Sequence, residues 1–429
     1  MLKISDNQRF LIHADGRPFF WLADTAWELF HRCTLEDAEE YLRDRAAKKF
    51  TVIQAVVLAE FDGLHQPAAN GHCPFFDDDP AQPNEAYFAH VDAVVQIAAV
   101  LGLHIAMLPT WGDKWNTRWG IGPQVFTSGN SRAYARWLAR RYKDAPIIWV
   151  LGGDRAIESA GHRTVMSELA AGLREGDGGN HLITFHPTGS QSSAQDFHDA
   201  NWLDFNMWQS GHSRNRDNYA CIASDYARVP TKPCLDAENG YEDHPAGFNI
   251  ENGYLDDYDV RRGAYWALFA GAFGHTYGCH DLWQFWTPKF TPITFCRRNW
   301  HEALNLPGAG QMQHARALIE SRPFLTRIPD QSLIVSDVGK SAHHVRATRD
   351  ESGAYAFIYL PTLKPVSVNL EKLSGSRIMA HWFNPRSGAA TRIGEFDRVG
   401  TREFIPPPAW PDWVLVLDDA SRGFATPGG

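Results

Sequence analysis

The chain of 429 residues is too long for a single ordinary core, and a barrel of about 250–300 residues followed by a smaller domain is a natural partition. Its net charge of −9, without any run of lysine and arginine, argues against a nucleic-acid or anionic-membrane partner. No apolar run reaches the length of a membrane span, and no signal segment stands at the start, so we expect a cytoplasmic protein, or an exported one if a signal peptide has been removed.

The cysteine and aromatic content narrow the choice of protein class further. The six cysteines are scattered, with neither a CxxC pair nor metal-ligand spacing, so we expect reduced thiols, with a single disulfide as the alternative. The chain holds 16 Trp, 13 Tyr and 25 Phe, and many of the tryptophans stand beside polar residues at expected strand ends. Much of this aromatic content fills the core, but flat rings at strand ends are also suited to stacking on sugars.

Up to about residue 290, strand-like and helical patterns alternate along the chain. Residues 9–18 predict a hairpin with Asp15-Gly16 at its tip. The expected strands then cover residues 19–23, 52–58, 104–108, 147–151, 182–185, 205–208, 234–237 and 275–278. The expected helices cover residues 34–49, 85–101, 131–142, 163–175, 217–228 and 256–270. This alternation predicts an α/β fold, a (β/α)8 TIM barrel, in which the unit between strands five and six is short and degenerate.

The composition changes after Arg322-Pro323. Short β-type runs joined by Gly, Pro, Ser and Asn turns occupy residues 332–335, 343–348, 355–360, 366–370, 377–383 and 413–417. They predict a compact all-β sandwich, which we expect to serve packing and carbohydrate contact rather than chemistry. We therefore expect a catalytic domain over residues 1–322 and a C-terminal β-sandwich domain over residues 323–429.

Two carboxylates follow apolar strand patterns. Residues 147–155 (IIWVLGGDR) predict a buried strand whose paired glycines turn the backbone and deliver Asp154 at its carboxyl end. We also expect side chains at the glycine positions to crowd a sugar out of reach of Asp154. Residues 233–243 repeat the pattern and offer Glu238. Strands four and seven face each other across a barrel mouth, so the two carboxyl groups could bracket one glycosidic bond, one protonating the leaving oxygen while the other stabilises or attacks the sugar carbon.

Each carboxylate also has a structural interpretation. Asp154 could be a capping aspartate that follows a strand. Glu238 could form a salt bridge within an acidic loop that also holds Asp236, Glu242 and Asp243. Because successive side chains of a strand point to opposite faces, Asp236 points away from its strand neighbour, and it is the main competitor for the nucleophile role.

Other polar and aromatic residues lie at expected strand ends, where a substrate would bind, and each has plain packing as its alternative. These candidate substrate-binding residues are Asp24, Trp27, Gln54, Trp111, His186, Asn206, Trp208, Asp236, Tyr277 and Trp283. For the histidines at 186, 212, 244, 275 and 280 we expect contacts to sugar hydroxyls or structural hydrogen bonds, since no HExxH spacing suggests a metal; no cofactor is expected. The absence of a GxSxG elbow, a P-loop and a dinucleotide fingerprint removes the common hydrolase, kinase and dehydrogenase interpretations.

Three segments resemble a known family. They are residues 19–32 (FFWLADTAWELFHR), 149–154 (WVLGGD) and 232–243 (KPCLDAENGYED). They are similar to the apiosidase-like glycoside hydrolases of family 140, in which a catalytic (β/α)8 barrel precedes a β-sandwich of the collagen-binding type. The resemblance covers essentially the whole chain, and in the tail residues 355–361 and 382–388 (WFNPRSG) fit the sandwich pattern.

The resemblance implies a retaining β-glycosidase with Asp154 as acid/base and Glu238 as nucleophile. It also implies action at apiose in plant glycosides or oligosaccharides, with xylosides, arabinosides or galactosides as alternative substrates. Two other classes remain open: a non-catalytic carbohydrate-binding barrel, and a lyase or esterase, which would need a metal site or a nucleophilic serine with a histidine base. The oligomeric state does not follow from the sequence.

Overall fold

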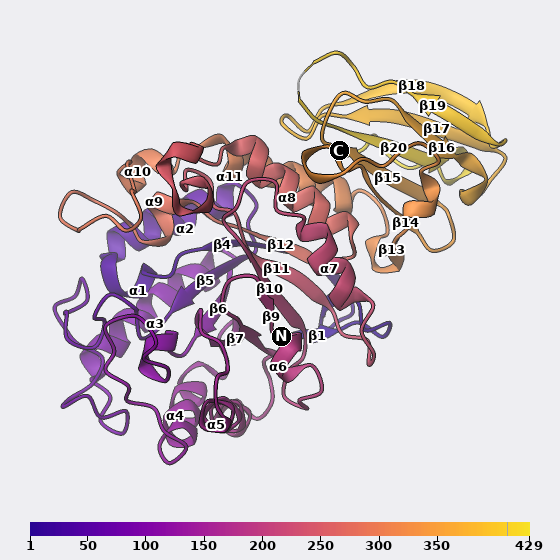
Figure 1. The fold of residues 1–429 in the computed structure, drawn as a ribbon. Coiled ribbons are helices and arrows are strands. Elements are labelled where there is room, and N and C mark those ends of the chain that lie inside the picture. The colour runs from indigo at the N-terminus through magenta and orange to yellow at the C-terminus, as the bar shows by residue number, and fades with distance from the viewer. Residues whose placement is uncertain (410) are drawn as a thin grey trace.

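A computed structural model describes residues 1–409 and 411–429 and shows two parts, an α/β part and a C-terminal antiparallel part (Figure 1). Within the described residues, each of the eight expected strand regions of the first part forms a strand. These strands are β4 (Trp21–Thr25), β5 (Val52–Val56), β6 (His104–Leu108), β7 (Ile147–Gly152), β8 (Ile183–His186), β10 (Asn206–Gly211), β11 (Cys234–Asn239) and β12 (Gly274–Tyr277). The ladder β12-β4-β5-β6-β7-β8 is parallel throughout, and β10 pairs with β11 in parallel.

A closed eight-stranded barrel is not confirmed, because in the described chain the ladder is interrupted between β8 and β10 and between β11 and β12. The first interruption has a local cause: the short strand β9 (Gln191–Ser192) pairs with Trp208 and Gln209 of β10 and occupies that edge. A few hydrogen bonds bridge the gaps, among them those from the Asp204 amide to the Ile183 carbonyl (2.9 Å) and from the Phe273 amide to the Cys234 carbonyl (3.1 Å). The sheet is therefore a strongly curled half-barrel with a loosely joined second piece.

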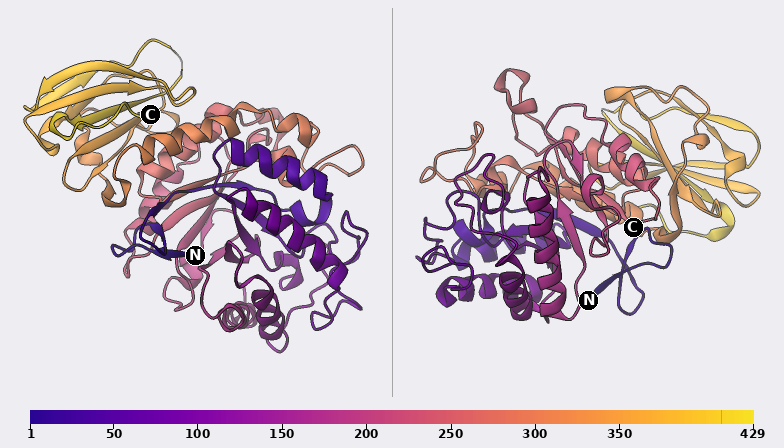
Figure 2. Two further views of the ribbon diagram at one scale, coloured as in Figure 1. Left: turned by 180° about the vertical axis from the view of Figure 1, so that it is seen from behind. Right: turned by 60° about the horizontal axis from the view of Figure 1, so that its bottom comes forward.

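Helices surround the strands on the outside (Figures 1 and 2). Those that were expected are α2 (Leu35–Ala47), α3 (Glu85–Val100), α4 (Ser131–Tyr142), α5 (Ala160–Asp177), α7 (Asn218–Tyr226) and α8 (Asp257–Phe269). The predicted capping box at Thr34 and Asp37 is present at the start of α2. Short helices α1 (Leu29–Arg32), α6 (Ala194–Phe197), α9 (His280–Trp283) and α10 (Trp300–Ala303) lie in the connections, and α6 replaces a full helix in the degenerate fifth unit.

Helix α11 (Pro307–Glu320) was not predicted, because its first turn contains glycines that weaken a helical pattern. One of them lies in close packing. A Cβ on Gly308 would lie 2.4 Å from Glu242 Oε2, and the Gly308 amide donates to Glu242 Oε1 at 3.1 Å. The start of α11 is therefore held against the loop that follows β11.

The N-terminal residues form a small antiparallel sheet of β1 (Leu2–Ile4), β2 (Leu11–His13) and β3 (Pro18–Phe19), whose position beside the N-terminus is visible in Figure 2. The predicted turn is confirmed, with Gly16 at φ 90°. Phe19 pairs with Leu11 in this sheet, so the first parallel strand begins two residues later than expected.

The C-terminal part is an all-β sandwich. One antiparallel sheet contains β13 (Arg327–Pro329), β14 (Arg346–Asp350), β15 (Tyr355–Leu360), β20 (Trp413–Asp419), β17 (Arg377–Phe383) and β18 (Ala390–Asp397), in that order. A second pairing joins β16 (Val366–Asn369) to β19 (Thr401–Phe404). The expected strand at 332–335 is wrong, because residues 331–333 form a 3₁₀ turn, while β13, β18 and β19 were not predicted.

Three further expectations from the sequence concern the cysteines, membrane spans and metal-binding groups. All six cysteines are free in the described structure. In the same described residues no helix has both the length and the apolar character needed to span a bilayer. Nor do these residues contain a group of three or more His, Cys, Asp or Glu arranged to hold a metal ion.

Candidate active site

A cavity of about 170 Å³ opens among the loops that follow the parallel strands, at their carboxyl ends. It is lined by Trp27, Glu60, Trp111, Asp154, Gln209, His212, Glu238, Tyr241, His244, Phe248, His280, Trp283, Ile293 and Thr294. The lining thus brings Asp154, which follows β7, and Glu238, on β11, into one cavity.

The end of β7 positions Asp154 through an unusual backbone. Gly152, Gly153 and Asp154 have φ angles of 97°, 90° and 56°, all in the left-handed region that favours glycine. A Cβ on Gly152 would lie 2.2 Å from the His186 carbonyl oxygen, and one on Gly153 would lie 2.8 Å from the Gly112 nitrogen. The prediction that side chains here would crowd the sugar is therefore corrected: they would collide with the neighbouring backbone.

The surroundings of Asp154 favour its protonated form. Burial in the cavity, and after it the negative charge of Glu238, raises the pKa of Asp154 to about 6, although His186 and Arg155 act in the opposite direction. Arg155 lies beside it, with Nη1 3.8 Å from Asp154 Oδ2 and donating to the Asp154 carbonyl oxygen at 2.8 Å. The side chain of Asp154 remains 26% exposed, so it can meet a ligand that enters the cavity.

Two imidazoles lie against Glu238, whose side chain is only 7% exposed. His212 Nε2 lies 3.1 Å from Oε1, and His186 Nε2 lies 3.1 Å from Oε2. The Tyr241 amide donates to His212 Nδ1 at 3.4 Å, so the His212 proton is on Nε2 and points to the carboxylate. Burial alone raises the pKa of Glu238, but the two histidines outweigh it and hold this pKa below its usual range.

The structure places only some of the predicted substrate-binding residues at the cavity. Trp27, Trp111 and Trp283 line it. His186 contacts Glu238 and packs edge-on against Trp27, with ring centroids 5.3 Å apart, so its place is beside the carboxylate.

The other predicted residues at strand ends are engaged elsewhere, which corrects their assignment to the substrate. Asp24 is fully buried and pairs with Arg45 while accepting from Tyr41 (2.7 Å). Tyr277 donates to Glu242 Oε2 at 2.6 Å.

Asp236, the competitor for the nucleophile role, is also fully buried and accepts hydrogen bonds from Ser210 (2.6 Å) and Asn218 (3.0 Å). Asp236 lies two residues before Glu238 on β11. Between these two residues the pairing of β11 with β10 is irregular, because its register shifts after Trp208 and again after Gln209. Asp236 is also absent from the cavity lining, which corrects its assignment to the substrate and removes it as a competitor for the nucleophile role.

The remaining three candidates pack within the sheet. Gln54 donates to the Ala237 carbonyl at 3.1 Å, just before Glu238 in the chain, and Asn206 contacts His198. Trp208 is half-buried and lies outside the cavity lining. A strand-end position alone could not separate these side chains from those that reach the cavity, because the sheet twists and bulges.

Glu60 is a third carboxyl group of the cavity and was not predicted. Burial, followed by the charges of Glu28 and Asp154, raises the pKa of Glu60 well above its usual range. The signal that could have found it is its place shortly after the apolar run of residues 52–58, the same pattern that identified Asp154. Gln209, Tyr241 and Phe248 were missed as well, since Gln209 stands at a register shift of β10 and the other two lie in the connection after β11.

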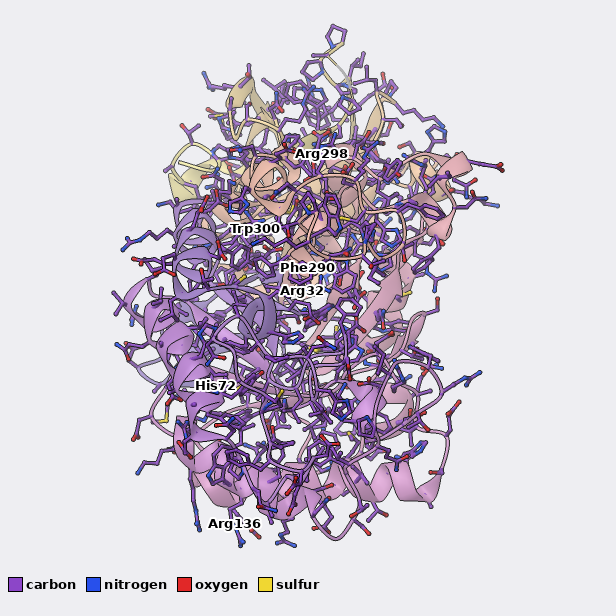
Figure 3. All side chains as sticks on the ribbon, turned by 90° about the vertical axis from the view of Figure 1, so that its left-hand side faces the viewer. Arg32, His72, Arg136, Phe290, Arg298 and Trp300 are labelled. Atoms are coloured by element: carbon purple, nitrogen blue, oxygen red, sulfur yellow. The ribbon has the colours of Figure 1, made fainter. Side chains whose placement is uncertain are left out.

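One side of the cavity is closed by the loop after α9. The His280 Nε2 atom lies 3.0 Å from the Ile293 carbonyl oxygen and 2.9 Å from that of Thr294. Further out, the Arg32 guanidinium lies 4.1 Å from the centre of the Phe290 ring, and Figure 3 labels Phe290 directly above Arg32. These contacts hold the loop in place as a wall of the cavity.

Comparison with solved structures defines the class of protein. A structure described as a glycoside hydrolase is 35% identical, covers 98% of this chain and 97% of that chain, and superposes with a TM-score of 0.90. A crystal structure described as a glycoside hydrolase family 5 protein from Bacteroides vulgatus ATCC 8482 is 33% identical, with coverages of 99% and 95% and a TM-score of 0.92. The chain therefore has a glycoside hydrolase fold.

Family models make the identification narrower. The model described as "Apiosidase-like, catalytic domain" matches residues 5–326, and one described as "Putative collagen-binding domain of a collagenase" matches residues 328–418. The chain belongs to the apiosidase-like family, as its three motif segments predicted. A comparison with curated proteins gave no match.

Proposed function

We propose that this protein is a retaining β-glycosidase, with Asp154 as acid/base, Glu238 as nucleophile and a β-apioside as the first substrate to test. The observation that carries the proposal is the contrast between two carboxyl groups of one cavity. Two histidines favour the ionised form of Glu238, whereas the pKa of Asp154 is raised to about 6. Such a pair, with the two pKa values pushed apart, is what an acid and a nucleophile require.

In the first step, a Glu238 oxygen attacks the anomeric carbon and forms a glycosyl ester, while Asp154 gives its proton to the leaving oxygen as the glycosidic bond breaks. In the second step, Asp154 takes a proton from water, the water oxygen bonds to the anomeric carbon, and the Glu238 carboxylate leaves. The two inversions give a product of the starting configuration. The Arg155 guanidinium donates a hydrogen bond to the main-chain carbonyl of Asp154 and so keeps the acid in place during both steps.

Cavity size supports action on a terminal sugar. An engineered cavity of about 150 Å³ accepts one benzene ring, so the space of about 170 Å³ is sufficient for one furanose or pyranose ring. The leaving group then extends toward solvent past the partly exposed Asp154. Membership of the apiosidase-like family favours apiose, and xylose, arabinose and galactose are the alternatives.

The test is a hydrolysis screen over β-apiosides, xylosides, arabinosides and galactosides with the wild type and Glu238→Gln. We expect the wild type to hydrolyse one glycoside class, and NMR to show that the sugar released first has the configuration of the substrate. The variant should fold normally and lose turnover. A first product of inverted configuration, or near-normal turnover by Glu238→Gln, would overturn the mechanism. Sugar binding without hydrolysis, indifferent to Asp154→Asn, would instead identify a carbohydrate-binding barrel.

A further inference from the structure

Three imidazole rings stand in a row on the Glu238 side of the cavity. His212 and His244 are stacked, with centroids 4.3 Å apart and an interplanar angle of 21°, and His280 meets His244 edge-on at 4.4 Å. His212 contacts Glu238, so the row begins at the proposed nucleophile. All three rings line the cavity.

The two outer rings use both of their nitrogens within the protein. His212 accepts from the Tyr241 amide and contacts Glu238, as described above. His280 Nδ1 accepts from the indole nitrogen of Trp283 at 3.2 Å, so its proton is on Nε2, which faces the two loop carbonyls. Neither ring has a nitrogen left for a ligand.

The middle ring differs. His244 is only 2% exposed, and its Nδ1 lies 2.7 Å from the Pro245 carbonyl oxygen, which can only accept a hydrogen bond. The proton of the neutral ring is therefore on Nδ1, and Nε2 carries a lone pair. No described residue makes a hydrogen bond to Nε2. This atom keeps some accessible surface, and because the ring lines the cavity, Nε2 is open to it.

The electrostatics keep this lone pair available. Burial, then the neighbouring His212 and His280, lowers the pKa of His244 far below its ordinary value, so the ring stays neutral at any pH at which the protein would act. A neutral ring with its proton fixed on Nδ1 is an acceptor at Nε2 and cannot donate there. A group that occupies this position must carry a hydrogen-bond donor, and a sugar hydroxyl is one.

We propose that His244 Nε2 accepts a hydrogen bond from one hydroxyl of the sugar ring that is attacked by Glu238, and that this contact selects sugars with a hydroxyl at that position. The inference rests on the proposed function and adds a specificity determinant to it. The contact belongs to the sugar ring and not to the leaving group, because His244 stacks on the histidine that holds Glu238, whereas the leaving group lies beside Asp154.

The test compares monodeoxy and deoxyfluoro analogues of the hydrolysed glycoside on the wild type, His244→Phe and His244→Gln. A fluorine cannot donate, so both analogues remove the contact. At one position we expect kcat/KM of the wild type to fall roughly 5- to 150-fold, the equivalent of one unpaired buried acceptor. His244→Phe keeps a ring in the row but has no acceptor, so this penalty should vanish there while penalties at other positions persist.

His244→Gln offers a carbonyl oxygen near the place of Nε2 and should restore part of the preference. Thermal unfolding of both variants checks that the row still forms. If His244→Phe lowers kcat/KM equally for all analogues and keeps every deoxy penalty, the proposal is overturned. If the wild type hydrolyses no glycoside, the proposed function fails. Binding of the free parent and deoxy sugars to the wild type and to His244→Phe then tests His244 separately. Equal affinities of the two proteins for every sugar would overturn its role.

Discussion

At the scale of single residues, the neighbours of each carboxyl group in the cavity give Glu238 and Asp154 different pKa values. Glu238 is almost inaccessible and faces two histidines, while Asp154 faces Glu238 and stays partly exposed. The charge of Glu238 therefore helps keep the proton on Asp154, so the two carboxyl groups form one unit.

This coupling predicts the pH dependence of kcat/KM. The reactive form has Glu238 ionised and Asp154 protonated, so kcat/KM should fall about tenfold per pH unit above about 6, as the proton of Asp154 is lost. The pKa of Glu238 is lowered, so the acid limb should lie below the ordinary carboxyl range. With a leaving group that needs no proton, the basic limb should flatten. A basic limb that begins only above pH 8 would contradict the assignment of Asp154.

A second residue-scale prediction concerns Glu60. Its raised pKa favours the neutral acid, for which Gln is a close mimic in charge and shape, and Glu60→Gln keeps a hydrogen-bond donor. We expect kcat/KM within a few-fold of the wild type and an unshifted basic limb. A loss as large as that of Asp154→Asn, measured on the same substrate, would make Glu60 the proton donor instead.

At the scale of elements, the turn after β7 has the strictest geometry of the site. Three consecutive residues have positive φ angles, and the backbones of the neighbouring loops approach two of them closely. Such a turn holds Asp154 at one place relative to Glu238, and catalysis is sensitive to displacements of about 1 Å.

Gly153→Ala tests this turn. The left-handed backbone costs a non-glycine residue about 1–3 kcal/mol, and the new Cβ would lie 2.8 Å from the Gly112 nitrogen. We expect a lower urea midpoint and a fall in kcat/KM of about 10²-fold. The matched control is Gly161→Ala in α5, where the nearest atom is 3.5 Å away and φ is ordinary; it should leave both quantities nearly unchanged. Equal effects of the two substitutions would show that the turn has no special role.

At the scale of the whole molecule, the sandwich is joined firmly to the α/β part. Tyr265 and Phe269 of α8 stack on Tyr359 and Phe357 of β15, with centroids 5.0 and 6.0 Å apart. Figures 1 and 2 show α8 between the parallel strands and the sandwich. One face of the sandwich is thus used for packing, as expected, while carbohydrate contact by this part stays a prediction.

A buried ion pair crosses the same interface. Arg261 on α8 binds Asp412 with two hydrogen bonds of 2.8 Å, and both side chains are at most 1% exposed. Asp412→Ala removes the fully buried carboxylate from Arg261, which keeps Asp257 and Gln311 as side-chain partners, and should lower the free energy of unfolding by about 3 kcal/mol in urea titrations. Combining Arg261→Met with Asp412→Leu should recover most of it. The exposed Asp397→Ala, which breaks a surface pair with Arg377, is the control and should change little. A small effect of Asp412→Ala would mean that the interface is weak.

Local patterns were sufficient for the repetitive elements. Helix α4 and strand β15 have the bounds expected from the sequence, because the apolar positions of α4 repeat with a helical period and β15 is a continuous apolar run. Helix α11 was missed because its start is selected by contact with Glu242, and β18 because its exposed residues carry no buried face. The interruption between β8 and β10 depends on β9, an element of two residues.

By itself, the sequence determined the alternation of strands and helices, the two-part architecture and the pair of Asp154 and Glu238, because each of these leaves a local pattern or motif. Only the tertiary structure decided which strand-end side chains face the cavity, added Glu60, and put His244 between two other imidazoles. These last features arise from sheet twist, bulges and loop packing, which bring together residues that are distant in the chain and carry no shared local signal.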